Sequence, residues 1–406
     1  MAKPGILYIS YDGMAEPLGQ SQVLAYLEHL AADYRIHLIS FEKNGPREAK
    51  EKVKARIAAA GIAWHPLTYH RSPTAIATSW DIAIGTIVAL WLALTHRLRI
   101  VHARSYVAAL IALPVKRLLG AKLIFDMRGF WADERVDGGL WPRDGRLYRI
   151  TKALERRFLL AADQIVALTR ASAAEIATFP YLHGRVPPIS VIPTCADLER
   201  FVRRPAPPHP FTFGFVGAAS RWSLFDEVLL CYRAILEALP DARLLIVNRE
   251  EQNFIRERLE AHQLGGTQVE LVAAEHRQMP DLISRMDAAA AIRRPAYSQL
   301  ACAPTKLAEY FGCGVPCLVN QGVGDVVEIV EADRTGIVLR VFAPDSIRTA
   351  AEQLVALARE PDIAARCVES AHRRFSLLDG VKAYRAIYAR LGGGAGTVQP
   401  GVETGG

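Results

Sequence analysis

The sequence lacks the short patterns that mark several large classes of protein. None of its six cysteines stands in a Cys-x-x-Cys pair, which excludes the usual zinc sites and suggests a reducing compartment. No Gly-x-Gly-x-x-Gly follows a predicted strand, so dinucleotide-dependent hydride transfer loses support. No Asp-x-Asp follows a strand to hold a divalent ion. We therefore expect neither a metal site nor a cofactor.

Long apolar segments are also absent. The longest apolar run, residues 82–94, is interrupted by Gly85 and Thr86. Such a run is too short to span a bilayer and fits a buried or interfacial helix. The first five residues lead directly into a strand-like segment at 6–10, so we expect no signal sequence and no transmembrane segment. A hydrophobic content of 51% with 22% charged residues is typical of a globular protein.

The charge is unevenly divided along the chain. Residues 1–200 hold 26 Lys and Arg against 18 Asp and Glu, whereas the remainder is close to neutral. A basic first half can bind nucleic acid, dock on an anionic membrane surface, or simply be a solvated face. No helix-turn-helix, zinc or RNP pattern is present, so we expect no nucleic-acid partner. The membrane surface and the solvated face both remain open.

Strand-like and helix-like segments alternate along the chain, which predicts doubly wound parallel sheets. Strands are expected near 6–10, 36–41, 100–105, 123–129, 164–168 and 190–193, and in a second series near 211–217, 242–247, 269–272 and 288–292. The fold class is therefore α/β, with two Rossmann-like domains. In such sheets ligands gather beyond the carboxyl ends of the strands. The polar residues just past these strands are the candidates for function.

Proline marks the boundary between the two series. Four prolines within residues 205–210 cannot continue a helix or a central strand, and they make a stiff connector. We assign residues 1–203 to the N-terminal domain, 204–210 to the linker and 211–380 to the C-terminal domain. Residues 381–391 form a final helix. The glycine-rich residues 392–406 are expected to be disordered.

One stretch of the second series, residues 303–331, has the features of a nucleotide-binding element. Pro304 suits the first turn of a helix, and Lys306 and Glu309 follow in its first two turns. Free backbone N–H groups and the positive end of the helix dipole favour phosphate. A carboxylate can accept paired hydrogen bonds from a ribose diol. An ordinary helix–strand–helix piece of an α/β domain is the alternative.

Three further segments place polar residues after strands of the first half. The turn after the first strand reads Asp-Gly-Met-Ala-Glu-Pro-Leu-Gly-Gln-Ser-Gln and ends at residue 22, and a later strand end carries His102 and Arg104. The third segment, residues 126–135, combines arginines, carboxylates and aromatic rings. Arginine offers a planar fork for phosphate, and aromatic rings suit sugar faces or lipid headgroups. A flexible turn, a structural histidine and a surface cluster of salt bridges are the respective alternatives.

Taken together, these segments resemble the family 4 retaining glycosyltransferases, which have the GT-B fold. The resemblance covers nearly the whole chain, to about residue 391. It implies that the second domain binds a nucleotide-diphospho-sugar and that the first, acceptor-side domain binds the acceptor across a cleft. It also implies retention of anomeric configuration, independence from metal ions, and a final helix that returns to pack on the first domain. In this family the glutamate matched by Glu309 holds the ribose.

The resemblance also implies the other site residues. On the donor side they are Glu309, Lys306, Thr305, Arg221, Ser298, Gly217 and Gly19. The catalytic candidates are His102, whose segment resembles one that faces the cleft in relatives, and Arg128 and Asp126, which stand about where many relatives carry a histidine whose role cannot be carried over. The chain departs from the family pattern in several places. Ala301 replaces the first of two paired glutamates, Ala303 replaces a helix-capping serine, and no lysine follows Arg221 closely. The histidine that many relatives carry in the 126–135 loop is absent.

The predicted activity is transfer of a hexose-type sugar to a glycan or lipid-linked acceptor. The basic first half and the apolar 82–94 segment suggest a cytoplasmic enzyme that is peripheral at the inner membrane face. Two alternatives remain. One is a nucleotide-sugar 2-epimerase of GT-B shape, which would act without an acceptor. The other is a non-catalytic protein that binds nucleotide sugar or scaffolds an assembly.

Overall fold

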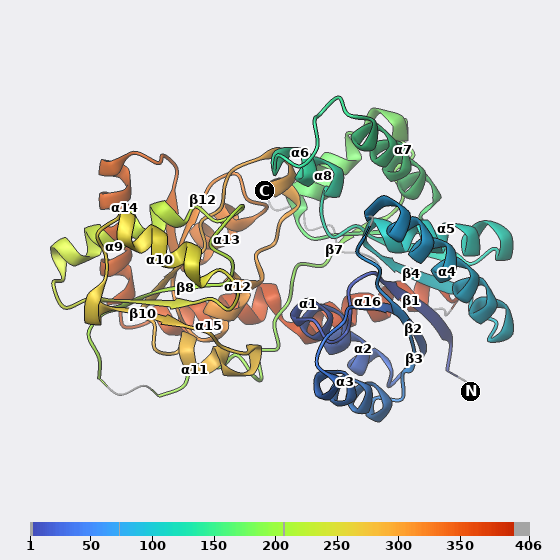
Figure 1. The fold of residues 1–406 in the computed structure, drawn as a ribbon, viewed down its shortest axis with the longest axis horizontal. Helices are drawn as coiled ribbons and strands as arrows, with labels where there is room; N and C mark the ends of the chain where they lie inside the picture. The colour runs from blue at the N-terminus through green and yellow to red at the C-terminus, as the bar shows by residue number, and fades with distance from the viewer. Residues whose placement is uncertain (1–2, 73, 206–207, 394–406) are drawn as a thin grey trace.

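Two parallel β-sheets, each covered by helices on both faces, divide the chain into two lobes (Figure 1). The structure is a computed structural model that describes residues 3–72, 74–205 and 208–393. One sheet has seven strands and lies in the N-terminal lobe, and the other has six and lies in the C-terminal lobe. This confirms the predicted fold of two doubly wound Rossmann-like domains.

The N-terminal sheet has the strand order β3-β2-β1-β4-β5-β6-β7. Its strands are β1 (Gly5–Ser10), β2 (Arg35–Glu42), β3 (Ala63–Thr68), β4 (Ile100–Arg104), β5 (Lys122–Asp126), β6 (Gln164–Ala167) and β7 (Ile189–Val191). The order reverses between β1 and β4, which is where ligands of such sheets bind. Strand β3 was not predicted from the sequence. It contains Pro66, which a sheet tolerates because β3 is an edge strand.

Two helical layers cover this sheet. One layer contains α4 (Thr74–Thr95), α5 (Ser105–Leu119) and α7 (Arg146–Ala161), with the shorter α6 (Trp131–Asp137) and α8 (Arg170–Ala177). The other contains α2 (Ala25–Leu30), α3 (Arg47–Ala59) and α16 (Leu377–Leu391). The chain enters the second layer through a short helix α1 (Pro17–Gly19) and a π-helical turn η1 (Gln20–Leu24). Such π-helical turns are frequent at functional sites.

Helix α4 corrects an expectation from the sequence. The apolar run at 82–94 lies inside a helix of 22 residues, and by length and composition alone this helix could cross a membrane. The expectation that the segment was too short counted only its uninterrupted apolar residues. The structure extends the helix to Thr74, across residues that the run did not include.

The C-terminal sheet has the order β10-β9-β8-β11-β12-β13. Its strands are β8 (Thr212–Val216), β9 (Arg243–Val247), β10 (Val269–Val272), β11 (Ala288–Ala290), β12 (Cys317–Asn320) and β13 (Gly336–Leu339). One face carries α9 (Phe225–Ala238), α10 (Gln252–Ala261) and α14 (Pro344–Ala358). The other carries α11 (Met279–Ile283), α12 (Thr305–Gly312), α13 (Val326–Asp333) and α15 (Ile363–Phe375).

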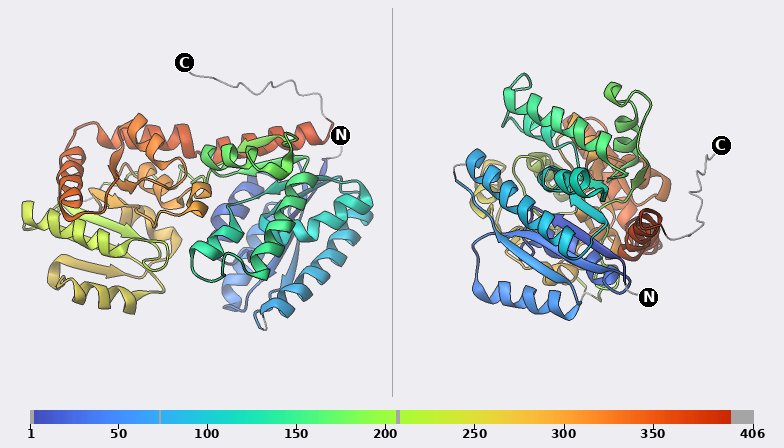
Figure 2. Two further views of the ribbon diagram at one scale, coloured as in Figure 1. Left: turned by 90° about the horizontal axis from the view of Figure 1, so that it is seen from above. Right: turned by 90° about the vertical axis from the view of Figure 1, so that its right-hand side faces the viewer.

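The last helix joins the two lobes. Helix α16 follows α15 after the single extended residue Ser376 and runs onto the N-terminal lobe, as Figure 2 shows from above. Its buried residues Leu377, Val381 and Tyr384 pack with α2 and the N-terminal sheet. The helix begins at Leu377, four residues earlier than predicted from the sequence, because Ser376 caps its N-terminus. Residues 206–207 of the predicted linker and 394–406 of the predicted tail lie outside the described residues.

Candidate donor and catalytic site

Helix α12 is the element on which the candidate donor site is built. Its residues Leu307, Tyr310 and Phe311 are buried at helical spacing against the C-terminal sheet. The backbone N–H of Val216 donates to the hydroxyl of Tyr310 at 2.8 Å, which ties the helix to the end of β8. This packing turns the remaining side of the helix, with Lys306 and Glu309, away from the core of the sheet.

The N-terminus of α12 offers a site for an anion. The N-cap residue is Pro304, which provides no side-chain cap. Ala303, where we expected the lost cap, lies one residue before it. Gly217 follows β8 with φ +97°, and a Cβ placed there would stand 3.8 Å from Nζ of Lys306. The ammonium of Lys306 lies 4.5 Å from the centre of the Phe215 ring. Gly217 and Lys306 therefore lie together, where backbone and ammonium can both face a phosphate.

Lys306 has an unusual electrostatic environment. Burial and, after it, the nearby positive charge of Arg293 lower the pKa of its ammonium to about 7, against the attraction of Glu309. Two positively charged side chains held close together are favourably placed to receive an anion. A bound diphosphate would restore the charge of Lys306.

Arg293 is a candidate donor residue that the sequence reasoning did not assign. It follows β11, and its backbone N–H donates to Asn320 Oδ1 at 2.7 Å while its Nε donates to Gln299 Oε1 at 2.8 Å. Within the described residues it forms no ion pair. The signal was present in Ile292-Arg-Arg-Pro295, which comes directly after a buried strand. Only the fold shows that this loop reaches the N-terminus of α12.

The ribose-binding candidate Glu309 lies in a cavity between the lobes. Its carboxylate is 3.0 Å from Nε2 of His276. The cavity has a volume of about 60 Å³ and is also lined by Thr305 of α12 and by Gln20 and Ser21 of the N-terminal lobe. A nucleotide sugar needs a pocket of several hundred Å³. The lobes must therefore move apart before such a ligand could enter this cavity.

Direct contacts hold the lobes in this closed arrangement. The hydroxyl of Tyr297 donates to Glu175 at 2.8 Å, and the rings of Tyr297 and Phe130 stack with their centres 5.4 Å apart. The predicted donor residue Ser298 takes part in the same contact, because its backbone N–H donates to Asp137 at 2.9 Å. Its hydroxyl is buried and finds no hydrogen-bond partner among the residues that the structure describes. The structure thus places Ser298 in the lobe contact, with an unpaired hydroxyl that a ligand could satisfy.

Ala301 lies in the same contact. It is buried, and its carbonyl oxygen would stand 3.8 Å from a Cβ at Gly129 of the N-terminal lobe. At the position where relatives carry a glutamate toward the donor sugar, this chain packs a methyl group against the opposite lobe. The methyl group of Ala301 has no atom that could hydrogen-bond to a sugar hydroxyl.

The three residues predicted to be catalytic lie together, but beneath α16. Nδ1 of His102 is 2.7 Å from the hydroxyl of Tyr388, and its Nε2 is 3.5 Å from the carboxylate of Asp126. Asp126 accepts a hydrogen bond from the hydroxyl of Tyr384 at 3.0 Å. We expected His102 and Asp126 to face the cleft. The structure instead buries both side chains between the sheet and α16.

Burial and the positive charge of Arg128 are two of the causes that set the protonation states of His102 and Asp126. Burial holds the pKa of His102 below its usual value, against the opposing pull of Asp126, so the ring is neutral at neutral pH. Burial alone would raise the pKa of Asp126, but the charge of Arg128 and the nearby imidazole of His102 bring it below its ordinary value. The cluster therefore holds one carboxylate and one guanidinium around a neutral imidazole.

Arg128 is the member of this cluster whose side chain keeps access to solvent. The side chain is 11% exposed, and its guanidinium is 3.8 Å from Asp126. Its backbone has φ +57°, a left-handed conformation that is costly for a residue with a Cβ. Strain of this kind gathers at functional sites, where surrounding contacts hold the residue in place. Asp126 outweighs the effect of burial and raises the pKa of Arg128, so its charge is permanent.

The remaining predicted donor residues lie at the edges of this arrangement. A Cβ at Gly19 would overlap the carbonyl oxygen of Gly13, so this glycine allows the loop after β1 to fold back over η1. Its neighbours Gln20 and Ser21, which the sequence reasoning did not assign, line the cavity instead. Arg221 is exposed, has φ +59° and makes no ion pair within the described residues. Its role as a phosphate ligand stays a prediction.

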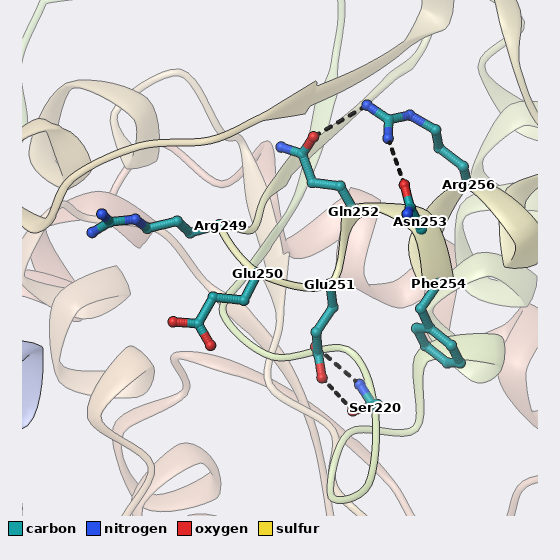
Figure 3. A pocket seen from close by; sticks show the side chains of 8 residues that line it. All are labelled: Ser220, Arg249, Glu250, Glu251, Gln252, Asn253, Phe254 and Arg256. Carbon is teal, nitrogen blue, oxygen red and sulfur yellow. Dashed lines mark hydrogen bonds between the residues drawn. The ribbon is translucent and has the colours of Figure 1, made fainter. Parts of the chain in front are cut away.

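A larger, open depression of about 510 Å³ lies beside the loop that follows β8 (Figure 3). The carboxylate of Glu251 accepts hydrogen bonds there from the backbone N–H of Ala219, at 2.6 Å, and from the N–H and hydroxyl of Ser220. Although burial opposes it, these donors lower the pKa of Glu251. The N–H groups that could face a phosphate are thus already bonded to a carboxylate, and Glu250 adds a second negative charge. Arg249 and Arg256 also line the depression, so side chains of both charges surround it. Its backbone N–H groups are nevertheless less free to bind a diphosphate than those at the uncapped start of α12.

No group of three or more His, Cys, Asp or Glu side chains within the described ranges is arranged to hold a metal ion. Metal independence remains a prediction from the sequence.

Two family models match consecutive parts of the sequence. The sequence matches the family model described as Glycosyltransferase Family 4 over residues 19–200 and the model described as Glycosyl transferases group 1 over residues 199–374. No curated protein matches the sequence. The two models meet at residues 199–200, close to the start of the predicted linker.

Solved structures share the fold over the whole chain. Sucrose-phosphate synthase from Thermosynechococcus elongatus superimposes with a TM-score of 0.73 at 13% identity, over 97% of this chain and 100% of the other. A glycosyltransferase from Rickettsia africae gives a TM-score of 0.71 at 13% identity, with 96% and 99% covered. Anabaena HepE, crystallised with UDP and glucose, gives 0.66 at 14% identity, with 95% and 99% covered.

Proposed function

Because the chain belongs to the family 4 glycosyltransferases of GT-B fold, we propose that it moves a hexose-type sugar from a nucleotide-diphospho-sugar to a glycan or lipid-linked acceptor. We further propose that the transfer retains anomeric configuration and needs no metal ion. The observation that carries the proposal is α12, which presents Lys306 beside Gly217 and Glu309 in the cavity between the lobes. HepE was solved with UDP and glucose. A uridine nucleotide is therefore the first donor class to test.

In this proposal the donor lies along α12. The diphosphate faces Gly217, the free N–H groups at the helix N-terminus, Lys306 and Arg293, while the ribose diol takes the carboxylate of Glu309 in place of His276. Negative charge develops on the leaving diphosphate during transfer. Positive groups fixed at that position stabilise it more in the transition state than in the ground state, which is the requirement for catalysis.

The buried cluster supports the reaction from the acceptor-side lobe. Arg128 is the proposed catalytic residue, since it alone of the three has solvent access and a strained backbone. His102 and Asp126 are proposed as positioning residues: Asp126 orients the guanidinium, and His102 is fixed by Tyr388. The acceptor is proposed to bind the N-terminal lobe, with the enzyme in the cytoplasm and peripheral at the inner membrane face.

Replacing Glu309 by alanine tests the donor site. The variant should weaken binding of UDP by about 1–3 kcal/mol, because a charged acceptor of hydrogen bonds from the ribose is lost. Isothermal titration calorimetry with UDP, GDP and ADP measures this and also identifies the base. The matched control is Glu331→Ala, which removes an exposed glutamate of α13 that is paired with Arg340. Equal affinities in wild type and Glu309→Ala would refute the assignment.

The packing of Ala301 favours one alternative, a protein that binds nucleotide sugar without transferring it. Incubating the protein with a donor that binds, with and without glycan acceptors, and following the sugar by NMR separates the possibilities. Transfer or hydrolysis supports the proposal, and a donor left intact despite measurable binding supports the alternative. Conversion of the donor to its epimer in the absence of acceptor would instead indicate a 2-epimerase.

A further inference from the structure

Helix α4 presents a continuous apolar stripe to solvent. Its members are 58–70% exposed and share one side of the helix at spacings of 3, 4 and 7 residues: Ile76, Trp80, Ile87, Trp91 and Leu94. Contiguous exposed apolar surface of this kind marks an interaction site in a soluble protein. Tryptophan, with a large apolar ring and one polar N–H, is the residue enriched where proteins meet the membrane interface.

The opposite side of α4 is held firmly in the N-terminal lobe. A Cβ at Gly85 would stand 2.8 Å from the side chain of Ile111 and 3.0 Å from that of Phe41, so the helix packs closely on α5 and β2. Asp81, the only acidic residue of the helix, is buried and accepts a hydrogen bond from Tyr11 at 2.8 Å. Nδ1 of His70 is 2.6 Å from the same carboxylate. A helix fixed in this way can lie along a bilayer but cannot cross it while the lobe stays folded.

The chain next to the stripe carries positive charge. The exposed face of α4 has no carboxylate, and the chain leaves the helix through exposed Arg97 and Arg99. Neither arginine forms an ion pair within the part of the chain that the structure describes. The end of α5, on the same side of the sheet, adds exposed Arg117 and Leu118.

Helix α7, in the same helical layer, also exposes arginines together with apolar side chains. Its outward side carries Arg146, Arg149 and Arg157 together with exposed Leu147 and Ile150. Its only acidic residue, Glu155, is buried. The three arginines have no carboxylate partner among the described residues. The right-hand view of Figure 2 shows α4, α5 and α7 in one layer of the N-terminal lobe. The basic excess of residues 1–200 thus includes a face with apolar residues at its centre.

We propose that this face, made by the outward sides of α4 and α7, docks on a bilayer that contains anionic phospholipid. Apolar side chains would enter the interface while the arginines contact lipid phosphates, which is the mode of helices that lie in the membrane plane. This face deepens the proposed function, because it rests on the peripheral membrane location proposed there. Vesicle binding needs neither donor nor acceptor, so its failure can be told apart from a failure of sugar transfer. A second copy of the chain is a poorer occupant, because a symmetric contact would bring two arginine-rich faces together.

The surface also connects to the acceptor-side lobe. Helix α4 begins at the edge of the sheet where the strands end, and Tyr11, which binds its Asp81, follows directly after β1. A bilayer along α4 therefore reaches the edge of the lobe at which a lipid-linked acceptor would be presented.

The test is co-sedimentation of the full chain with vesicles of phosphatidylcholine alone and of phosphatidylcholine mixed in equal parts with phosphatidylglycerol. Wild type should bind the mixed vesicles, and added salt should weaken that binding. The pair Trp80→Gln and Trp91→Gln should lower binding about tenfold or more, and so should the triple Arg146→Gln, Arg149→Gln and Arg157→Gln. Sedimentation velocity without lipid reports the oligomeric state of each protein.

Matched variants outside the face made by α4 and α7 serve as controls. The pair Val341→Gln and Leu378→Gln removes exposed apolar side chains, and the triple Arg243→Gln, Arg348→Gln and Arg359→Gln removes equal charge. Both should bind vesicles like wild type, and all four variants should keep the wild-type melting temperature. Vesicle binding that the α4 and α7 variants leave unchanged would overturn the proposal. So would a wild-type dimer that the Trp80 and Trp91 pair converts to monomer without affecting vesicle binding.

Discussion

Replacing Arg128 by alanine is expected to lower kcat by about 10²- to 10³-fold, the typical effect of removing one group that stabilises transition-state charge. The dissociation constant for the nucleoside diphosphate should change little, because Gly217, Lys306 and Glu309 belong to the other lobe. Single-turnover transfer assays with a donor identified by calorimetry measure the first effect, and calorimetry itself measures the second.

Loss of stability could imitate this result, because the substitution leaves the buried carboxylate of Asp126 without its cation. Breaking a buried ion pair costs about 3–5 kcal/mol. The double variant Arg128→Met with Asp126→Asn removes both charges, and it should recover most of the stability in urea unfolding. If it also recovers wild-type kcat, Arg128 has a structural role only, and the catalytic assignment is wrong.

Affinity for UDP is expected to fall by at least about tenfold between about pH 7 and pH 9. A tenfold change corresponds to the loss of one hydrogen bond to a charged group. Lys306 has a pKa of about 7 in the free protein, so it loses its proton across this range while the bound diphosphate favours the charged form. The phosphates contribute little, since the second ionisation of a phosphate lies near about pH 6. Calorimetric titrations at several pH values measure the slope.

Lys306→Met should remove this pH dependence and bind UDP weakly at every pH. It should also raise the melting temperature at neutral pH. The folded pKa of Lys306 lies below the unfolded value of about 10.4, so the unfolded chain binds more protons between the two values. The lysine therefore destabilises the wild-type fold at neutral pH, and wild-type stability should rise with pH through this window. A flat binding profile in wild type would contradict the placement of the diphosphate.

Local pattern was sufficient to predict most of the fold. The periodicity of apolar residues predicts buried strands and the amphipathic helices that follow them. Helix α12, with Glu309 and Lys306, was predicted correctly. The failures have physical causes. Pro66 made β3 look unlike a strand, although an edge position tolerates it. The polar start of α4 hid its length, because an apolar run and a helix need not begin at the same residue.

The site was harder to predict because long-range packing decides it. The predictions for His102 and Asp126 relied on their places at strand ends. Their partners Tyr388 and Tyr384 lie on a helix more than 250 positions later in the sequence, and that helix covers them. Nothing local to Ser298 or Ala301 shows that both lie at the contact between the lobes. Arg293 was missed for the same reason. It is a loop arginine with no distinguishing motif, and only the fold brings it near Lys306.

The central claim is that α12 holds the donor nucleotide, and a crystal structure of the protein with UDP tests it most directly. The account predicts lobes further apart than in the closed arrangement described here, with the ribose hydroxyls on the carboxylate of Glu309. The diphosphate should lie against Gly217, Lys306 and Arg293. A nucleotide bound elsewhere, for instance in the depression beside Glu251, with Glu309 still paired to His276, would contradict it.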